Sequence, residues 1–400
     1  DISVDDLYTN LNDFIYSVDT SYGYAKKSIV SEFENNYVNN LLGKMIISTP
    51  VSSLPVDGTY PTNTSKHGTP KINEFIPQWN TDLCTQCGAC SMACPQGALR
   101  IKAYDDIKLN EAPETLKHIP SIDFDLLNYT VQINPRQCNG CNNCMDACPV
   151  KALKQVKKDS VLKEEISNWT YFESIPEFDR TKIDSLKISQ QQLQEPLFKY
   201  SSGVEGCGEA PYLKLMSQLF GDRMLVANAT GASSIFGGTL STTPWSQNEN
   251  GQGPAWSNSL FEDNAEFGLG FRVSINKQEQ IAKQLLKSLL PELNFDLAHS
   301  ILNNKQSSEI EINKQRLQIE ILKEQLKKIN SYLAKQLLAV VDNLIKKSVW
   351  IVGGDGWAYD IGYGGLDHVL ASGEHVNILV LDNEVYDNTG AQASKATPFG

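Results

Sequence analysis

Two cysteine-rich stretches decide the fold of this chain: CTQCGACSMACP at residues 84–95 and CNGCNNCMDACP at residues 138–149. Both follow the pattern C-x2-C-x2-C-x3-C-P, and the similarity continues past the last cysteine, where CPQGALRI is matched by CPVKALKQ. The chain holds nine cysteines, and all but one of them fall in these two tetrads. The pattern indicates one small supersecondary unit that is used twice and is built around its thiols.

The spacing of the thiols favours iron–sulfur clusters. A cubane cluster needs four thiolates aimed at one point, and tight loops with two-residue gaps supply three of them. The tetrads resemble those of bacterial two-cluster ferredoxins, in which the fourth cysteine of each run reaches the other cluster. We therefore expect two [4Fe–4S] clusters. The expected ligands are Cys84, Cys87, Cys90 and Cys148 for the first, and Cys138, Cys141, Cys144 and Cys94 for the second. A pair of zinc sites is the alternative, but such sites usually pair two short C-x2-C knuckles.

Length, charge and composition bound the remaining possibilities. The chain has 400 residues, which predicts two or three domains. A formal net charge of −12 argues against nucleic acid as a partner. No apolar run is long enough for a transmembrane helix, so no membrane partner is expected. The odd number of cysteines with metal-type spacing predicts a reducing, intracellular compartment, either the cytoplasm or an anaerobic-type organelle.

A second motif, GGDGWAYDIGYGGLDHVL, begins at residue 353 after an apolar run that is typical of a buried strand. A second predicted strand leads to LDNEVYDNTG. Gly-Asp-Gly followed by Asn at this distance resembles the thiamine diphosphate motif, because glycines let the backbone approach a diphosphate and Asp and Asn oxygens suit Mg2+. The expected cofactor-binding residues are Gly354, Asp355, Gly356, Asn383 and Val385, with Asp355 and Asn383 as the metal ligands. An ordinary strand-to-helix turn is the alternative for the glycines alone.

At this point the chain resembles the 2-oxoacid:ferredoxin oxidoreductase family, and within it the pyruvate:ferredoxin (flavodoxin) oxidoreductases. Four blocks in the family's order carry the resemblance: LPVDGTYPT (54–62), GCGEAPYLKLMSQLFGDRMLVANATG (206–231), GGDGWAYDIGYGGLDHVL (353–370) and NEVYDNTGAQASKATP (383–398). The implied fold is an α/β thiamine diphosphate-binding domain, with a parallel sheet flanked by helices, plus a small α+β dicluster bacterial-ferredoxin-like domain.

The resemblance also implies a reaction, the thiamine diphosphate-dependent oxidative decarboxylation of pyruvate to acetyl-CoA with electron transfer through [4Fe–4S] clusters. The implied partners are pyruvate, coenzyme A, ferredoxin or flavodoxin as electron acceptor, the remaining domains of the same enzyme, and a second copy in a homodimer. Glu209 is implied to be a catalytic and cofactor-binding residue, and Asn388 a catalytic residue near the reacting carbon. A turn residue is the alternative for Asn388. This chain alone is expected to be inactive.

A third cluster is expected to be lost. In the family, the stretch equivalent to 204–207 carries C-x2-C and the equivalent of ATG at 229–231 is followed by another cysteine, whereas here Val204 and Ala232 stand at two of these positions. Only Cys207 remains, and we expect it to be a buried small residue. Two alternatives to the enzyme are an electron-relay or scaffold protein with a non-catalytic thiamine domain, and a fusion enzyme that passes electrons to a flavin/NADP module.

The sequence also predicts how the chain is divided. The Gln/Ser-rich stretch DSLKISQQQLQEPLFKYSSG indicates a linker along a surface. The expected parts are the end of a preceding domain (1–53), a connecting segment (54–79), the ferredoxin-like domain (80–156), a linker (157–200), and the thiamine diphosphate-binding domain (201–400), incomplete at its C-terminus, with a helical insertion at about 274–347. In the insertion, an apolar stripe predicts a helical hairpin packed on its own domain, with coiled-coil pairing as the alternative. The stripe comprises Ile319, Leu322, Leu326, Ile329 and Leu333.

Overall fold

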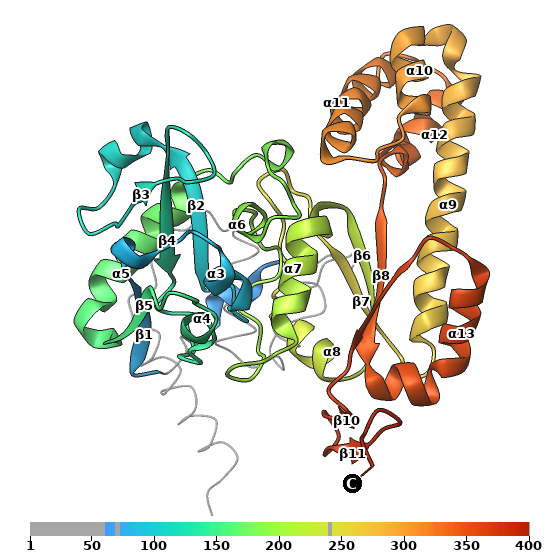
Figure 1. The fold of residues 1–400 in the computed structure, drawn as a ribbon. Coiled ribbons are helices and arrows are strands. Elements are labelled where there is room, and N and C mark those ends of the chain that lie inside the picture. Colours follow the sequence, from blue (N-terminus) through green and yellow to red (C-terminus); the bar gives the residue numbers. More distant parts are fainter. Residues whose placement is uncertain (1–60, 69–72, 239–241, 400) are drawn as a thin grey trace, which may run out of the picture.

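The computed structural model of this protein describes residues 61–68, 73–238 and 242–399. Figure 1 shows a ferredoxin-like body, coloured blue to green, beside an α/β body coloured green to red, with a group of helices at one end of the second body. The stretch 1–53 lies outside the described residues, as does most of the LPVDGTYPT block. The predicted fold class, an α/β domain with a parallel sheet plus a dicluster ferredoxin-like domain, is confirmed.

The ferredoxin-like body contains two antiparallel sheets, of order β1-β5 and β2-β4-β3. Its strands are β1 (Phe75–Trp79), β2 (Leu99–Asp105), β3 (Ile119–Pro120), β4 (Leu127–Ile133) and β5 (Leu153–Lys157). Two short helices, α3 (Ala89–Ala93) and α4 (Asn143–Asp146), each carry the third cysteine of a tetrad. Since β1 pairs with β5, strand pairing in this body begins before residue 80, inside the stretch predicted to connect two domains.

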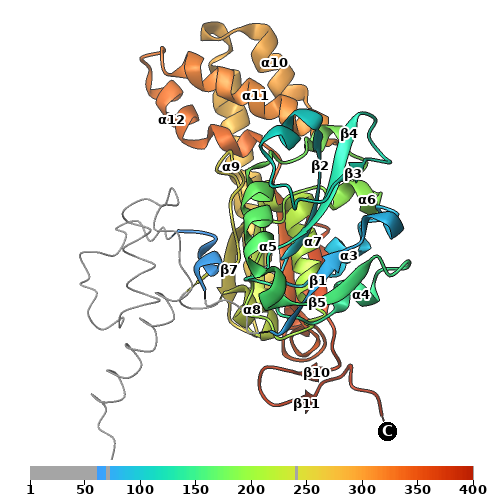
Figure 2. The same cartoon turned by 90° about the vertical axis from the view of Figure 1, so that its left-hand side faces the viewer.

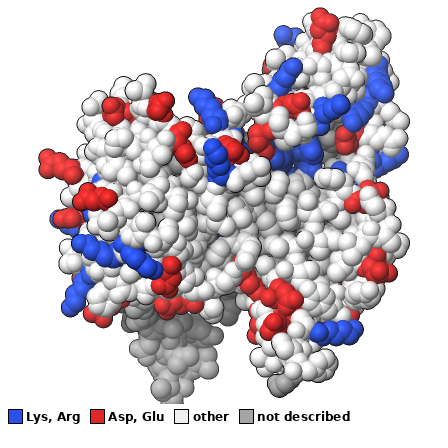
Figure 3. Space-filling model, in the orientation of Figure 1, with Lys and Arg blue, Asp and Glu red and all other residues white. Residues whose placement is uncertain are grey.

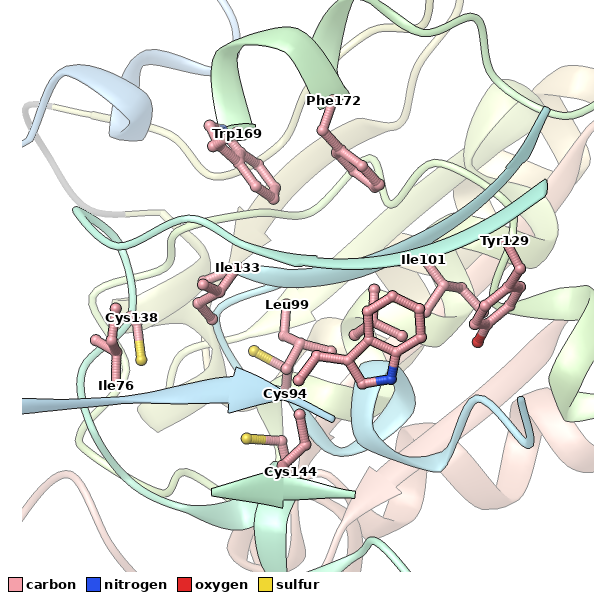
Figure 4. Packing of buried hydrophobic residues seen from close by; sticks show 14 of the residues in the cluster. Ile76, Cys94, Leu99, Ile101, Tyr129, Ile133, Cys138, Cys144, Trp169 and Phe172 are labelled. Atoms are coloured by element: carbon pink, nitrogen blue, oxygen red, sulfur yellow. The ribbon is translucent and has the colours of Figure 1, made fainter. Parts of the chain in front are cut away.

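The prediction that residues 157–200 form a surface linker was wrong. Helix α5 (Lys158–Ser174) buries Trp169 and Phe172 in the core of the ferredoxin-like body. Figure 4 shows these two rings on one side of the strands and the cysteines on the other. The short helix α6 (Ile188–Gln191) follows, and its glutamines are buried. Composition misled here because buried amides that are hydrogen-bonded to one another look, in sequence, like a solvated segment.

The second body is built on a parallel sheet of order β7-β6-β8-β9. Its elements are α7 (Ala210–Phe220), β6 (Met224–Ala229), α8 (Ala232–Gly237), β7 (Ala255–Ser259), α9 (Asn264–Ser288), β8 (Ser348–Gly354), α13 (Tyr363–Ser372) and β9 (Asn377–Leu381). Helix α7 packs its apolar face on Met224 and Val226, while α9 and α13 cover Ile351 on the opposite face. Gly268 lets α9 approach β8 closely, because a Cβ there would stand 2.3 Å from Cγ1 of Ile351. The buried sheet thus brings the carboxyl ends of β6, β8 and β9 to one edge.

Beyond the sheet, α9 continues into a separate helical group with α10 (Phe295–Asn303), α11 (Glu309–Leu326) and α12 (Tyr332–Val340). Figure 2 shows this group standing apart at one end of the molecule. Ile319, Leu322 and Leu326 of the predicted stripe are buried within it, so they pack on their own domain, whereas Leu333 is 39% exposed. The long helix begins at Asn264, ahead of the predicted start of the insertion, because its first turns cover the sheet.

The chain after β9 forms a small antiparallel hairpin, β10 (Val385–Tyr386) and β11 (Gln392–Ala393). A π-helical turn, Gly356–Ile361, joins β8 to α13. Short 3-10 helices occupy several connections, at Thr64–His67, Thr81–Leu83, Asp106–Glu111, Arg180–Lys182, Gly221–Arg223, Leu290–Glu292 and Val341–Leu344. Across the described ranges, no helix combines the length and apolar character needed to cross a membrane.

Candidate cofactor sites

The first predicted set of thiols surrounds one cavity. It is walled by apolar side chains that include Trp79, Tyr129 and Leu153. All four cysteines of the first set line it: Cys84, Cys87, Cys90 and Cys148. Burial, together with the neighbouring thiols of this set, raises the pKa of Cys90 to about 12. The cavity therefore joins the fourth cysteine of the second tetrad to the first three of the first.

The second set converges on the other side of the short helices. Figure 4 shows the sulfur atoms of Cys94, Cys138 and Cys144 turned toward a common space beside β1. Burial, together with the neighbouring thiols of Cys94 and Cys141, raises the pKa of Cys138 to about 12. The crossing of the two tetrads follows from the short helices α3 and α4, which pack against each other.

The backbone of the two loops repeats the same curl. The second and fourth residues after the first cysteine of each tetrad have positive φ: Gln86 (57°), Gly88 (74°), Gly140 (78°) and Asn142 (66°). This curl turns backbone N–H groups inward, and that of Gln86 donates to Sγ of Cys84 over 3.4 Å. In the described ranges, no three His, Cys, Asp or Glu side chains converge as ligands of a single ion. Separately, the four thiols of the first set line one cavity, and a cubane is held by four thiolates, each of which binds a different iron.

The predicted thiamine residues line one hollow at the carboxyl edge of the parallel sheet. All seven of them are present: Glu209, Gly354, Asp355, Gly356, Asn383, Val385 and Asn388. Asp355 directly follows β8 and is 1% exposed, whereas Asn383 follows β9 and is exposed. Because β8 and β9 are adjacent and parallel, their ends bring these two side chains to the same hollow.

Hydrogen bonds hold the polar side chains of the hollow together. Nδ2 of Asn383 donates to Oε1 of Glu209 over 3.1 Å and to Oδ2 of Asp387 over 2.6 Å. The Ser394 hydroxyl donates to the buried Asp355 carboxylate. Burial raises the pKa of Glu209 to about 7, and the charge of Asp387 acts in the same direction. Figure 3 shows acidic side chains gathered beside the β10–β11 hairpin, so this part of the surface is complementary to a cation.

Several lining residues have no recognisable signal in the sequence. The hollow also contains Thr230, Ser233, Phe261, Trp357 and Tyr386. Gly356 is required by the approach of Tyr386, because a Cβ at this glycine would stand 2.5 Å from the Tyr386 ring. The Tyr386 hydroxyl in turn donates to Asp360 over 2.8 Å. Nε1 of Trp357 is buried without a hydrogen-bond partner, which leaves one donor unsatisfied beside the hollow.

The loop that precedes α7 connects the hollow to the second thiol set. Burial raises the pKa of Cys141, and hydrogen bonds from the backbone N–H groups of Asn143 and Gly206 act in the opposite direction. Three residues after Gly206, Glu209 lines the hollow. Val204 is 76% exposed. Cys207 is half-buried against the core of the sheet, so the prediction of a buried small residue was only partly right.

Comparison with known proteins agrees with this geometry. A family model described as a 4Fe-4S dicluster domain matches residues 83–152. The chain is 56% identical to the pyruvate-flavodoxin oxidoreductase of Trichormus variabilis, covering 90% of this chain and 32% of that protein. It is 51% identical to the putative pyruvate-flavodoxin oxidoreductase of Synechocystis, with 94% and 32% covered. A more distant relative, 39% identical, is the pyruvate dehydrogenase [NADP(+)] of Cryptosporidium parvum, with 92% of this chain and 21% of that protein covered.

The predicted family resemblance is therefore confirmed, and it extends over nearly the whole chain. The sequence spans about one third of the length of the first two relatives. The iron–sulfur prediction is supported by the dicluster match, which covers both tetrads. We conclude that this chain is similar, over nearly its whole length, to the pyruvate-flavodoxin oxidoreductases.

Proposed function

We propose that the chain forms the part of a pyruvate:ferredoxin (flavodoxin) oxidoreductase that holds thiamine diphosphate, Mg2+ and two [4Fe–4S] clusters. The enzyme would oxidatively decarboxylate pyruvate to acetyl-CoA and pass the electrons to flavodoxin or ferredoxin. One observation carries this proposal: Asp355, Asn383 and Glu209 share one hollow, and the loop that ends at Glu209 contacts Cys141 of the second thiol set.

The residues of the hollow fit the cofactor chemically. The Asp355 carboxylate, the Asn383 amide oxygen and the Val385 carbonyl would bind Mg2+, which prefers oxygen ligands. Gly354 has space above its backbone, since its nearest neighbour would lie 3.8 Å from an added Cβ, and this leaves room for a diphosphate. When bound, thiamine diphosphate supplies the carbanion chemistry at the 2-oxoacid carbon. Glu209 orients the Asn383 amide by accepting its hydrogen bond.

The cysteines would then conduct the electrons away. We propose that the first set holds one cluster and the second set holds the other, as their crossed arrangement around two spaces suggests. Val204 and Ala232 cannot bind iron, so we further propose that the third cluster of the family is absent. Electrons would leave the hollow across the loop 204–209, which contacts Cys141 directly.

The cofactor assignment is tested by calorimetry on the full-length protein purified without oxygen. Asp355→Ala should abolish Mg2+-dependent binding of thiamine diphosphate, because it removes the buried carboxylate ligand. Asp382→Ala is the matched control: this exposed acid immediately precedes Asn383 but does not line the hollow, so binding should persist. Unchanged binding by Asp355→Ala would refute the assignment.

Two alternatives have distinct signatures. An electron relay or scaffold would accept electrons from dithionite but would not reduce a viologen dye when given pyruvate and coenzyme A, whereas the proposed enzyme would. A fusion enzyme is favoured by the similarity to the pyruvate dehydrogenase [NADP(+)] of Cryptosporidium parvum. Full-length protein of that kind would reduce NADP+ in a pyruvate-dependent assay. The proposed partners further include the remaining domains of the enzyme and a second copy of it, which light scattering would detect as a homodimer.

A further inference from the structure

A single buried lysine joins the thiamine domain to the thiol loops. Lys214 lies on α7, one turn after the start of the helix, and is 1% exposed. Its Nζ donates to three backbone carbonyls of the ferredoxin-like body: those of Ser91, Met92 (3.1 Å) and Cys94 (2.8 Å). An ammonium group has three donors, so its hydrogen-bonding capacity is filled by this one segment.

These carbonyls belong to the end of α3, the helix that carries Cys90 and leads to Cys94. The last carbonyls of a helix have no partner within it and carry partial negative charge, so a cation there is stabilising. Cys90 belongs to the first thiol set and Cys94 to the second. The ammonium of Lys214 therefore lies where the two sets meet, and it interacts electrostatically with both thiols.

The charge of Lys214 is not balanced by a carboxylate. Among the described residues, no Asp or Glu forms an ion pair with it, and the charges that act on it are those of Cys94, Cys90 and Arg100. By contrast, two buried cations of the ferredoxin-like body are paired, since Arg100 and Lys102 share the carboxylate of Glu177 at 2.7 and 2.9 Å. Burial lowers the pKa of Lys214 to about 8, and an anionic group bound nearby would favour the charged form of this side chain.

We propose that Lys214 is a positioning residue that holds the cluster loop 90–94 against α7 and raises the reduction potentials of both clusters. This inference rests on the proposed function to the extent that it requires two [4Fe–4S] clusters. Reduction adds one negative charge to a cluster already bound by thiolates, and a fixed buried cation favours that state. Net charge and hydrogen bonding around the sulfurs are established determinants of cluster potential.

Gln218, an uncharged neighbour of Lys214, allows the effect of the charge to be distinguished from the effect of packing at the same interface. Gln218 lies one turn further along α7 and is also 1% exposed. Its side chain donates a hydrogen bond to the carbonyl of Gln194 and accepts one from the side chain of Gln192. The side chain of Gln192 in turn accepts a hydrogen bond from the Ser91 hydroxyl. Both residues hold the same interface, but only Lys214 carries charge. Gln218→Met is therefore a matched control that disturbs the interface without changing its charge.

The experiment is a potentiometric titration of the full-length protein, followed by electron paramagnetic resonance. In Lys214→Gln, reduction of both clusters should become about tenfold less favourable, a shift of about 59 mV for one electron. Lys214→Arg should stay close to wild type because it keeps the charge, and Gln218→Met should also stay close. Unchanged potentials in Lys214→Gln, or an equal shift in Gln218→Met, would overturn the inference.

Failure of a variant to assemble clusters is also informative. If Lys214→Gln does not assemble its clusters, Lys214→Met is titrated in its place. Loss of the clusters from both uncharged variants, with retention of the clusters in Lys214→Arg, would show that the clusters require the positive charge at this position. Loss of the clusters from Lys214→Arg as well would overturn the inference that the charge is what matters. The titration uses dithionite and mediators, so it does not depend on pyruvate or thiamine. A wild-type protein without [4Fe–4S] signals would refute the proposed function itself, whereas normal signals with an unaffected Lys214→Gln would refute this inference alone.

Discussion

Glu177 offers a direct test of how the segment after α5 stabilises the ferredoxin-like body. Its carboxylate accepts from both Nη atoms of Arg100, at 2.7 and 3.2 Å, and pairs with Nζ of Lys102 at 2.9 Å. The side chains of Arg100 and Lys102 are 5% and 2% exposed. Glu177→Gln keeps the shape of the side chain but removes the carboxylate charge that the two buried cations on β2 share.

The contribution of the Glu177 charge to the free energy of unfolding follows from the pKa of this side chain. Burial raises this pKa, but Arg100 and Lys102 lower it more strongly, from 4.5 to about 2. Each pKa unit corresponds to about 1.4 kcal/mol, so the charge contributes roughly 3 kcal/mol to the free energy of unfolding. Removing one partner of a buried ion pair typically costs about 3–5 kcal/mol, which agrees. Because the folded-state pKa is the lower one, the contribution is complete above about pH 4.5 and is lost as the pH falls toward 2.

The assay is urea unfolding of the full-length protein, monitored by the visible absorbance of its clusters. Glu177→Gln should lower the midpoint by an amount equivalent to about 3 kcal/mol, and because the carboxylate is fully charged in this range the difference should be constant between about pH 6 and pH 8. Glu164→Gln on the exposed face of α5 is the control and should stay within about 0.5 kcal/mol of wild type. Equal midpoints for the two variants would refute the stabilising role of Glu177.

Three further outcomes are expected. Gly356→Ala should weaken Mg2+-dependent thiamine diphosphate binding in calorimetry and cost about 1–3 kcal/mol of stability, since its Cβ would collide with Tyr386; wild-type affinity would contradict this. Anaerobically purified full-length protein should contain about eight iron atoms per chain, as two four-iron clusters require, and about twelve would contradict the proposed absence of the third cluster. Phe172→Ala should cost about 3–5 kcal/mol in the urea assay, because the ring is fully buried; a loss below 1 kcal/mol would argue against its place in the core.

The residues of the site that could be predicted were those that lie a few residues apart in a recognisable local pattern. The x2 gaps place three thiols on one loop, and the loop curl at Gly88 and Gly140 needs no information from elsewhere in the chain. Likewise, Asp355 and Asn383 each follow a recognisable strand, so their shared position at the sheet edge could be inferred from parallel pairing. The roles of these residues as ligands remain predictions.

The segment 157–200 shows why the rest could not be inferred. Its glutamines form a buried hydrogen-bonded group with α3 and α7, and Glu177 pairs with cations on β2. Each of these contacts joins residues far apart in the chain, and no local pattern distinguishes a glutamine that bonds another buried amide from one that faces water. The same holds for Tyr386 and Trp357, whose place in the hollow depends on how the hairpin folds back over the sheet.

The sequence by itself determined the two cysteine tetrads and the diphosphate-type turn with its Asn partner, because these features depend on local spacing and on strand order. Only the tertiary structure decided that Glu209 joins Asn383, that the loop before α7 contacts Cys141, and that Lys214 lies between the two thiol sets. The physical reason is that burial and hydrogen bonding across a domain interface are set by which surfaces pack together, and a sequence does not display that choice.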